Sequence, residues 1–278
     1  MSTDTPPYVL DPGWHAERDR LNSLTQLYDP ITMAIVERLD LPRDARCAEV
    51  GAGTGSVAEL LTRHIGPAGQ VLAVDTDTRF LEPLAPSGIA VAQQDLTRTG
   101  LATGQFDLVH ARLLLEHLPQ RDAVLASLAG SLAPGGWLFV EDFDWGGGTL
   151  VDPPSPVHER VTNACREFMR SRGYDPEYGR RLPRSLAAAG LVEVGTHATA
   201  VHVQADPHLG VPQWELLVQQ LAPGMLAGDL VSPSDLEHFT TLCHHGDSVF
   251  FAPLMISSWA RRTSGATRPE FLSRAERP

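Results

Sequence analysis

The sequence predicts an α/β fold, because segments typical of strands and of helices alternate from residue 46 to residue 141. Residues 46–50 have the length and pattern of a buried strand, and Gly51, Gly53 and Gly55 follow directly. Apolar side chains then recur at helical spacing, at Val57, Leu60, Leu61 and Ile65. Strands joined by helices in this way form parallel sheets with right-handed crossovers, so we expect five parallel strands up to residue 141.

The glycine-rich turn predicts a site for a cofactor that contains a nucleoside. Glycine lacks a Cβ, so Gly51, Gly53 and Gly55 can adopt positive φ and let a ligand approach the backbone closely. Asp75 ends the next expected strand and reaches the same crevice, where its carboxylate can accept hydrogen bonds from both ribose hydroxyls. A dinucleotide fingerprint has glycine where this chain has Ser56, so the turn alone leaves the kind of cofactor open.

The segments before the first strand are expected to cover the crevice. Residues 1–12 are rich in proline and are predicted to be a loosely attached leader. Apolar residues at helical spacing follow from Leu21 to Ile35. Pro30 interrupts them, so we expect two helices with a break at this proline.

The segments after the fifth strand predict more helices and two further strands. Residues 157–168 carry an apolar stripe typical of a helix. A sixth strand is expected over residues 190–203 and a last one over residues 250–259. Between these strands, Ser232-Pro233-Ser234-Asp235 has a capping serine, a proline at the first helical position and an acid at the third, so a helical insert is predicted.

Five short motifs, in order, resemble those of class I S-adenosylmethionine-dependent methyltransferases. Glu49 precedes the glycine turn, and Asp75 follows the second strand. Gln94-Asp95-Leu96 resembles the acidic motif of that family that contacts adenine, and residues 106–111 resemble its fourth strand. Residues 132–136 resemble the turn before its fifth strand. The resemblance is strongest to stand-alone bacterial enzymes that methylate small molecules, including natural products.

This resemblance implies a Rossmann-like sheet of seven strands in the order 3-2-1-4-5-7-6, with strand 7 antiparallel, helices on both faces and a small helical cap. It divides the chain into residues 1–40, a leader with cap helices, and residues 41–278, a methyltransferase domain with a helical lid insert at about 205–246. The insert contains apolar side chains that suit a lid over a hydrophobic acceptor: Trp214, Leu216, Leu217, Leu221 and Met225.

By the same resemblance, the cofactor is S-adenosyl-L-methionine and its product is S-adenosyl-L-homocysteine. Asp75 is assigned to the ribose, and Asp95 to the adenine amino group, although an aspartate after a strand can instead cap a turn. Arg18 or Arg20 is expected to bind the cofactor's carboxylate. The expected cofactor-binding residues are Glu49, Gly51, Ala52, Gly53, Gly55, Asp75, Thr76, Gln94, Asp95, Leu96, His110, Ala111 and Arg20.

Two residues are candidates for a general base, which only some methyl acceptors require. His110 is expected at the end of the fourth strand, facing the crevice, and histidine titrates near neutral pH. A histidine bonded to backbone is the structural alternative. Asp144 follows the fifth strand and is expected to enter the acceptor pocket, with Trp145 as one wall.

Composition limits the partners. The formal charge is -12, from 34 acidic and 22 basic residues, which would repel a phosphate backbone, so nucleic acid is not expected. No apolar run approaches membrane-spanning length and residues 1–10 lack a signal-peptide pattern, so we expect no membrane partner and a cytoplasmic location. Cys47, Cys165 and Cys243 lack paired spacing, so neither disulfides nor a metal site are expected. A homodimer is compatible with this composition.

The function predicted from these observations is methyl transfer to a small molecule, on O, N or C, with a hydrophobic secondary metabolite as the expected acceptor. Two alternatives stay open. A nicotinamide-dependent oxidoreductase shares the glycine turn, although Ser56 and the lack of a hydride-site motif count against it. A protein that binds the cofactor without methylating would share every cofactor motif.

Overall fold

The computed structural model describes residues 9–264. The predicted leader therefore lies mostly outside the described residues. The part that is described is not loosely attached, because Leu10 is 3% exposed and packs into the apolar core of the cap. None of the described helices combines the length and apolar character needed to cross a bilayer.

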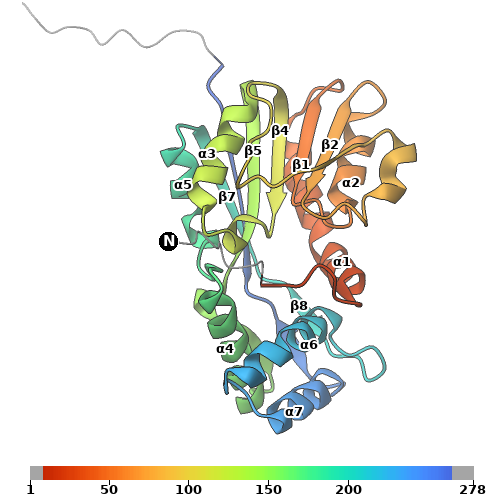
Figure 1. Cartoon of the computed structure of the whole chain (residues 1–278), viewed down its shortest axis with the longest axis vertical. Coiled ribbons are helices and arrows are strands. Elements are labelled where there is room, and N and C mark those ends of the chain that lie inside the picture. The colour runs from red at the N-terminus through yellow and green to blue at the C-terminus, as the bar shows by residue number, and fades with distance from the viewer. Residues whose placement is uncertain (1–8, 265–278) are drawn as a thin grey trace, which may run out of the picture.

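Seven strands form the central sheet, and its topology confirms the predicted order (Figure 1). The strands are β1 (Arg46–Val50), β2 (Gln70–Asp75), β3 (Ala90–Gln93), β4 (Phe106–Arg112), β5 (Leu132–Asp144), β7 (Val192–Thr199) and β10 (Leu254–Arg261). They lie in the order β3-β2-β1-β4-β5-β10-β7. Strands β1 to β5 pair in parallel, and β10 is antiparallel to both β5 and β7. The carboxyl ends of β1, β2 and β4 therefore meet at one edge of the sheet.

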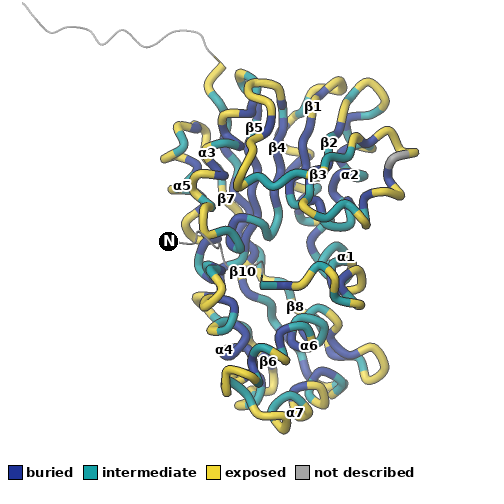
Figure 2. Tube along the Cα trace, viewed as in Figure 1, coloured by how far each residue is buried: buried dark blue, intermediate teal, exposed yellow. Residues whose placement is uncertain are grey.

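Helices cover both faces of this sheet and form two apolar cores. On one face, α3 (Arg121–Ser131) and α5 (Leu182–Ala188) pack against the strands. On the other face lie α2 (Ser56–Ile65) and the last turns of α1 (Glu17–Val36). Figure 2 shows β1, β4 and β5 buried along most of their length between these layers. A fully buried aliphatic side chain in such a layer contributes about 1.5–3 kcal/mol.

A helical cap with its own core stands at the carboxyl edge of the sheet (Figure 1). It contains α4 (Pro156–Ser171), α6 (Pro212–Ala227) and α7 (Pro233–Cys243), together with a sheet of β6 (Leu150–Asp152), β9 (Val249–Phe251) and β8 (His202–Gln204). The predicted helix start at Ser232 is confirmed, because Ser232 and Asp235 form a reciprocal capping box at α7.

The predicted break at Pro30 is wrong, because α1 continues through this proline. Proline removes one hydrogen bond from a helix interior. Here the flanking turns are held by packing, since Tyr28 on one side and Thr32 and Ile35 on the other are buried. Tertiary contacts thus outweigh the local preference.

The predicted sixth and last strands each divide in two. Residues 192–199 belong to the central sheet as β7, whereas residues 202–204 belong to the cap sheet as β8. The last strand divides in the same way into β9 and β10. At the crossing, the Ala252 amide donates to the Val201 carbonyl, so two connections pass side by side from sheet to cap. A continuous strand pattern in the sequence does not reveal a change of partner strand.

Candidate functional site

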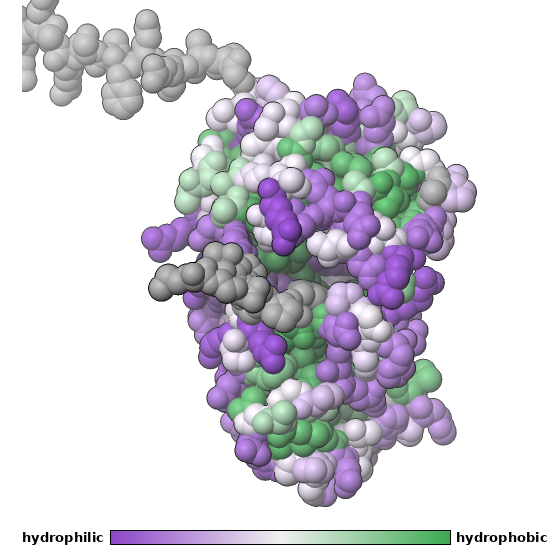
Figure 3. Space-filling view, in the orientation of Figure 1, coloured by the Kyte–Doolittle hydropathy of each residue, from purple (hydrophilic) through white to green (hydrophobic). Residues whose placement is uncertain are grey.

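A cavity of about 390 Å³ lies between the carboxyl edge of the sheet and the cap. Ligands of open α/β sheets bind at this edge. Figure 3 shows apolar surface where the part of the molecule that contains the central sheet meets the cap. One end of the cavity is formed by the turn after β1 and the ends of β2 and β3, and the other by aromatic residues of the cap, so a single space joins two chemically different walls.

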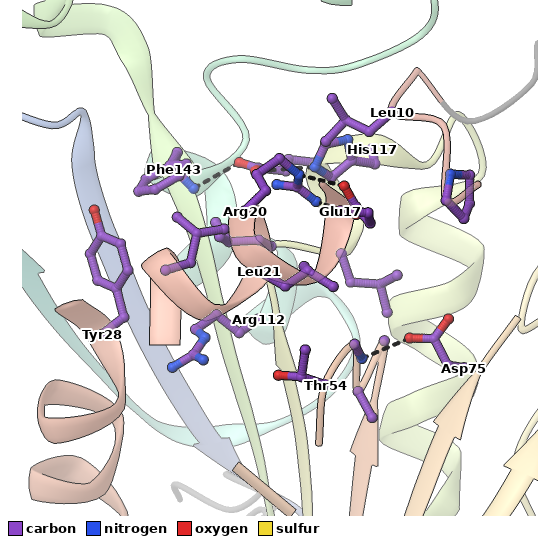
Figure 4. Close-up of a pocket in the computed structure, with 18 of the residues that line it drawn as sticks. Leu10, Glu17, Arg20, Leu21, Tyr28, Thr54, Asp75, Arg112, His117 and Phe143 are labelled. Carbon is purple, nitrogen blue, oxygen red and sulfur yellow. Dashed lines mark hydrogen bonds and ion pairs between the residues drawn. The ribbon is translucent and has the colours of Figure 1, made fainter. Parts of the chain in front are cut away.

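The glycine turn has the positive φ angles that the sequence predicts. Gly51, Gly53 and Gly55 adopt φ of 68°, 55° and 79°, a region that disfavours other residues. The Gly53 amide donates to Asp75 Oδ2 over 2.8 Å, the contact drawn at the right of Figure 4. This bond fixes the turn against β2 and places the Asp75 carboxylate beside it.

Asp75 and Asp95 lie at this end of the cavity. Asp75 also accepts from the Asp77 amide through Oδ1, over 3.1 Å. Asp95 lines the cavity as well, but its Oδ1 accepts from the amide and the hydroxyl of Thr97, over 2.9 and 2.7 Å. Asp95 therefore caps a turn, which is the alternative that the sequence left open, and it does so at the cavity wall.

The opposite end is a chamber of aromatic rings. Trp145 lies 5.8 Å from Trp214 and 6.3 Å from Phe143 between ring centroids, and all three line the cavity. Trp145 Nε1 donates to the Tyr174 hydroxyl over 2.8 Å. Tyr28 from α1 closes the chamber against Phe143, with 5.6 Å between centroids. Such walls favour a planar, apolar ligand.

Buried polar groups stand between the two ends. Arg20 of α1 is 6% exposed and binds Glu17 through Nε and Nη2, over 2.8 and 2.6 Å (Figure 4). Burial, together with the charges of Arg20 and Arg121, lowers the pKa of His117 to about 3. His117 is therefore a neutral imidazole at neutral pH, and it lines the cavity.

Glu116 lines the same wall and has the opposite shift. Burial raises its pKa well above the usual range, and the Asp142 carboxylate adds to the rise. Glu116 Oε2 accepts from the Phe143 amide over 2.7 Å, and Oε1 lies 3.6 Å from His117 Nε2. Two titratable side chains thus stand together beside the aromatic chamber.

The structure brings most of the expected cofactor-binding residues to the cavity and leaves some away from it. Those that line it are Arg20, Glu49, Gly51, Ala52, Gly53, Asp75, Thr76 and Asp95. Gly55 does not line the cavity. It is the residue before α2 and packs closely against Leu84, since a Cβ on Gly55 would lie 2.1 Å from Leu84 Cδ1. Gln94 instead donates to the carbonyls of Thr99 and Gly100. Leu96 and Ala111 pack with the apolar core under α3.

His110 does not face the cavity, contrary to the sequence-based expectation. β4 continues two residues further, to Arg112, so His110 is not at the end of its strand. Its ring is fully buried beneath α1, with Nδ1 2.6 Å from Glu49 Oε2 and Nε2 3.1 Å from Glu141 Oε2. A side chain enclosed in this way cannot reach a methyl acceptor.

Asp144 is also absent from the cavity wall. Its two oxygens bind Nη2 and Nε of Arg180, each over 2.7 Å. Oδ1 also accepts from the Gly146 amide, over 2.8 Å. Asp144 therefore stabilises the turn after β5, while its neighbour Trp145 lines the chamber as expected.

Comparison with known proteins agrees with this geometry. Residues 48–140 match the family model described as a methyltransferase domain. The chain is 32% identical over 200 residues to methyltransferase str3 of Strobilurus tenacellus, and the alignment covers 71% of this chain and 69% of that protein. It is 32% identical over 170 residues to methyltransferase str2 of the same organism, which covers 61% of each. The chain thus spans less than two thirds of the length of str2.

The chain belongs to the class I S-adenosylmethionine-dependent methyltransferases. The cofactor of this family is S-adenosylmethionine, so the predicted family, enzyme class and cofactor are confirmed. A solved methyltransferase, phosphoethanolamine N-methyltransferase 2 of Haemonchus contortus in complex with S-adenosyl-L-methionine, shares the fold. Its TM-score is 0.54 at 16% identity, covering 90% of this chain and 61% of that one.

The residues of this methyltransferase fit its cofactor. Gly53 adopts a φ of 55°, which other residues rarely take, and a Cβ there would reach van der Waals contact with Leu21 Cδ1 of α1, 3.6 Å away, so the turn and this helix face each other across a narrow space. Asp75 supplies carboxylate oxygens for ribose hydroxyls, and Glu49 supplies a buried carboxylate at the turn. Arg20 supplies a cation on the opposite side (Figure 4).

Sequence reasoning missed several residues of the methyltransferase cavity, among them Arg112, Glu116 and Tyr174. Arg112 carried a usable signal, since it is two residues after His110 and so shares its side of β4, one step nearer the carboxyl edge. Glu116 carried a weaker signal, since it follows the carboxyl end of β4 by only four residues. Tyr174 carried no signal, because only the packing of the cap brings it to the cavity.

Proposed function

We propose that this methyltransferase transfers a methyl group to a small, largely apolar and aromatic molecule that binds in the chamber of the cap. The observation that carries the proposal is the continuity of the cavity. The glycine turn and Asp75 line one end, and the aromatic rings around Trp145 and Trp214 line the other. A cofactor and an acceptor bound at the two ends would meet between them, near Arg20 and Glu116.

In this proposal the cofactor is held by the residues at the sheet edge. Gly51 and Gly53 admit it to the backbone, Asp75 binds the ribose and Asp95 lies toward the adenine. Arg20 is the proposed partner of the carboxylate, because it is buried at the cavity wall and the guanidinium can bind a carboxylate through two donors.

The bound cofactor supplies a methyl group made electrophilic by a sulfonium. The protein then has to align the acceptor with that group and keep water away. Leu21, Tyr28 and Trp214 do both, since they line the space with apolar surface from α1 and α6. Positioning of this kind can supply several kcal/mol of the barrier reduction, about 7–11 kcal/mol in the best-oriented cases.

An acceptor that reacts through a hydroxyl must also lose a proton. Glu116 is the proposed proton acceptor, because it lines the chamber and because burial and the Asp142 carboxylate raise its pKa, which makes its carboxylate a stronger base. His117, held neutral, is the proposed hydrogen-bond partner that orients the hydroxyl. An amine acceptor could attack in its neutral form and would not need Glu116.

Two experiments test this function. Calorimetry should detect micromolar binding of S-adenosylhomocysteine and none of NADH. Transfer of a tritiated methyl group to extracts of small molecules should then yield a labelled, solvent-extractable product. Binding without any labelled product from aromatic acceptors would contradict the proposed transfer and favour a protein that only binds the cofactor.

Four further predictions about the acceptor, the partners and the location are part of this proposal. A hydrophobic secondary metabolite as acceptor, a homodimer, a cytoplasmic location and the exclusion of nucleic acid are proposals of this kind. The apolar chamber supports the first, since it is lined by five aromatic side chains: Tyr28, Phe143, Trp145, Tyr174 and Trp214.

A further inference from the structure

Three ionisable side chains from adjacent strands form a continuous buried array beneath α1. His110 of β4 lies between Glu49 of β1 and Glu141 of β5, with 2.6 Å from Nδ1 to Glu49 Oε2 and 3.1 Å from Nε2 to Glu141 Oε2. All three are at most 3% exposed. Glu49 is the member that lines the cavity, so the array runs from the cofactor site into the sheet.

The far end of the array is held by neutral donors. Glu141 Oε2 accepts from the Thr32 hydroxyl of α1, and Glu141 Oε1 accepts from the Ser257 hydroxyl of β10, each over 2.5 Å. The nearby charged groups are Arg112, which donates to Thr32 over 2.9 Å, and its partner Asp29 of α1. Glu141 therefore has partners on both oxygens and is fixed in place.

These contacts determine where the charges lie. The two carboxylates raise the pKa of His110 to about 9 against the opposing effect of burial, so its ring is an imidazolium at neutral pH. Burial raises the pKa of Glu49, and the charge and hydrogen bond of His110 act against this rise. The pKa of Glu141 is lowered by the same histidine. With both nitrogens protonated, the ring donates to each carboxylate.

Glu49 has one oxygen left for a ligand. Its contact with His110 uses Oε2, and Oε1 makes no hydrogen bond to the described residues. Two other acids of the cavity have contacts on both oxygens, since Asp75 accepts from the Gly53 and Asp77 amides and Glu17 binds Arg20 through both oxygens. A buried carboxylate with a free oxygen is suited to a cationic group.

We propose that His110 is a positioning residue that keeps Glu49 charged and fixed, so that Glu49 binds the α-ammonium group of the cofactor's amino acid. This inference rests on the proposed function, because it assumes that the cofactor occupies the cavity. It assigns His110 a role in cofactor recognition in place of proton transfer.

The test uses two ligands that differ in one amino group. S-adenosylhomocysteine carries the α-ammonium, whereas 5'-S-(3-carboxypropyl)-5'-thioadenosine lacks it and keeps the carboxylate. Calorimetry at pH 7 should show that the parent protein prefers the first ligand by roughly 10-fold or more, as expected for a hydrogen bond to a charged group. Glu49→Gln and His110→Gln should each reduce this preference to less than about threefold, with the affinity for the deamino ligand nearly unchanged.

A matched control is His158→Gln, which replaces another buried histidine, 2% exposed, that does not line the cavity. It should keep the parental preference. If His110→Gln keeps the preference, or weakens both ligands equally, His110 has only a structural role and the inference is wrong. If the parent binds neither ligand, the proposed function itself fails.

A second measurement does not depend on a folded variant. Nitrogen-15 chemical shifts of the His110 ring in the parent protein distinguish an imidazolium from either neutral tautomer. Two protonated nitrogens at pH 7 support the inference, whether or not a cofactor is bound. A neutral ring at pH 7 overturns it, because a neutral imidazole cannot donate to both carboxylates.

Discussion

Arg112 at the end of β4 binds Asp29 in the middle of α1, with 2.7 Å between Nη2 and Oδ1. Arg112 is also bonded to Thr32, one turn further along the same helix. The side chains of Arg112 and Asp29 are 9% and 19% exposed. This ion pair joins the helix that covers the cofactor end of the cavity to the strand that borders it.

Replacing Arg112 should therefore loosen α1. Arg112→Met leaves a mostly buried Asp29 without its cation, and we expect a loss of roughly 3 kcal/mol in the free energy of unfolding, measured with urea. The control is Arg63→Met, because Arg63 and Glu59 form an exposed pair 3.9 Å apart whose loss should cost less than about 1 kcal/mol. Equal effects of the two substitutions would contradict this role of Arg112.

Removing the Asp75 carboxylate should weaken cofactor binding without unfolding the protein. Asp75→Ala loses the proposed ribose contacts and the bond to the Gly53 amide, so we expect S-adenosylhomocysteine to bind more weakly by about 1.5–3 kcal/mol. Asp107→Ala is the control, since Asp107 caps the Arg46 amide at the opposite end of the sheet. A folded Asp75→Ala protein with parental affinity would show that Asp75 does not hold the ribose.

Glu116 and Asp144 should differ in their effect on methyl transfer. Glu116→Gln should lower turnover of a hydroxyl acceptor by roughly 100-fold or more with cofactor affinity little changed, as expected for loss of a general base. Asp144→Asn should change turnover by less than about threefold, because Asp144 binds Arg180 outside the cavity. Steady-state kinetics with one acceptor compares both variants, and the reverse ranking would restore Asp144 as the candidate.

The buried His117 should make stability depend on pH on the acid side. Its pKa is about 3 in the folded protein and about 6.5 when unfolded, so the unfolded chain binds the proton more readily. This histidine therefore contributes no instability above about pH 6.5, and stability falls as the pH drops from there toward 3. Between pH 7 and pH 5 we expect a loss of roughly 1–2 kcal/mol from this group.

Urea unfolding at the two pH values measures that loss. His117→Gln should lose less stability than the parent over this interval, whereas His197→Gln, which replaces an exposed histidine of β7, should lose as much as the parent. A parental slope in His117→Gln would show that His117 is not the group that titrates.

Local sequence determined much of the fold and the cofactor end of the site. Gly51, Gly53 and Gly55 form the turn after β1 because glycine readily adopts positive φ. The start of α7 follows from the hydrogen bonds between Ser232 and Asp235, which are only three residues apart. The position of Asp75 at the end of an apolar run places it at the sheet edge in any parallel sheet. Such features depend on neighbours a few residues away.

Contacts between distant segments decided the rest. Whether His110 faces a ligand or the interior depends on where β4 ends, and two further residues of pairing with β5 bury it. Pro30 stays in a helix because Tyr28 and Thr32 are packed by partners remote in sequence. Glu116 and Tyr174 meet the cavity only once the cap has folded. The sequence indicates which residues can form a turn or a strand. The direction of each side chain and its charge depend on burial and on partners that only the tertiary structure brings together.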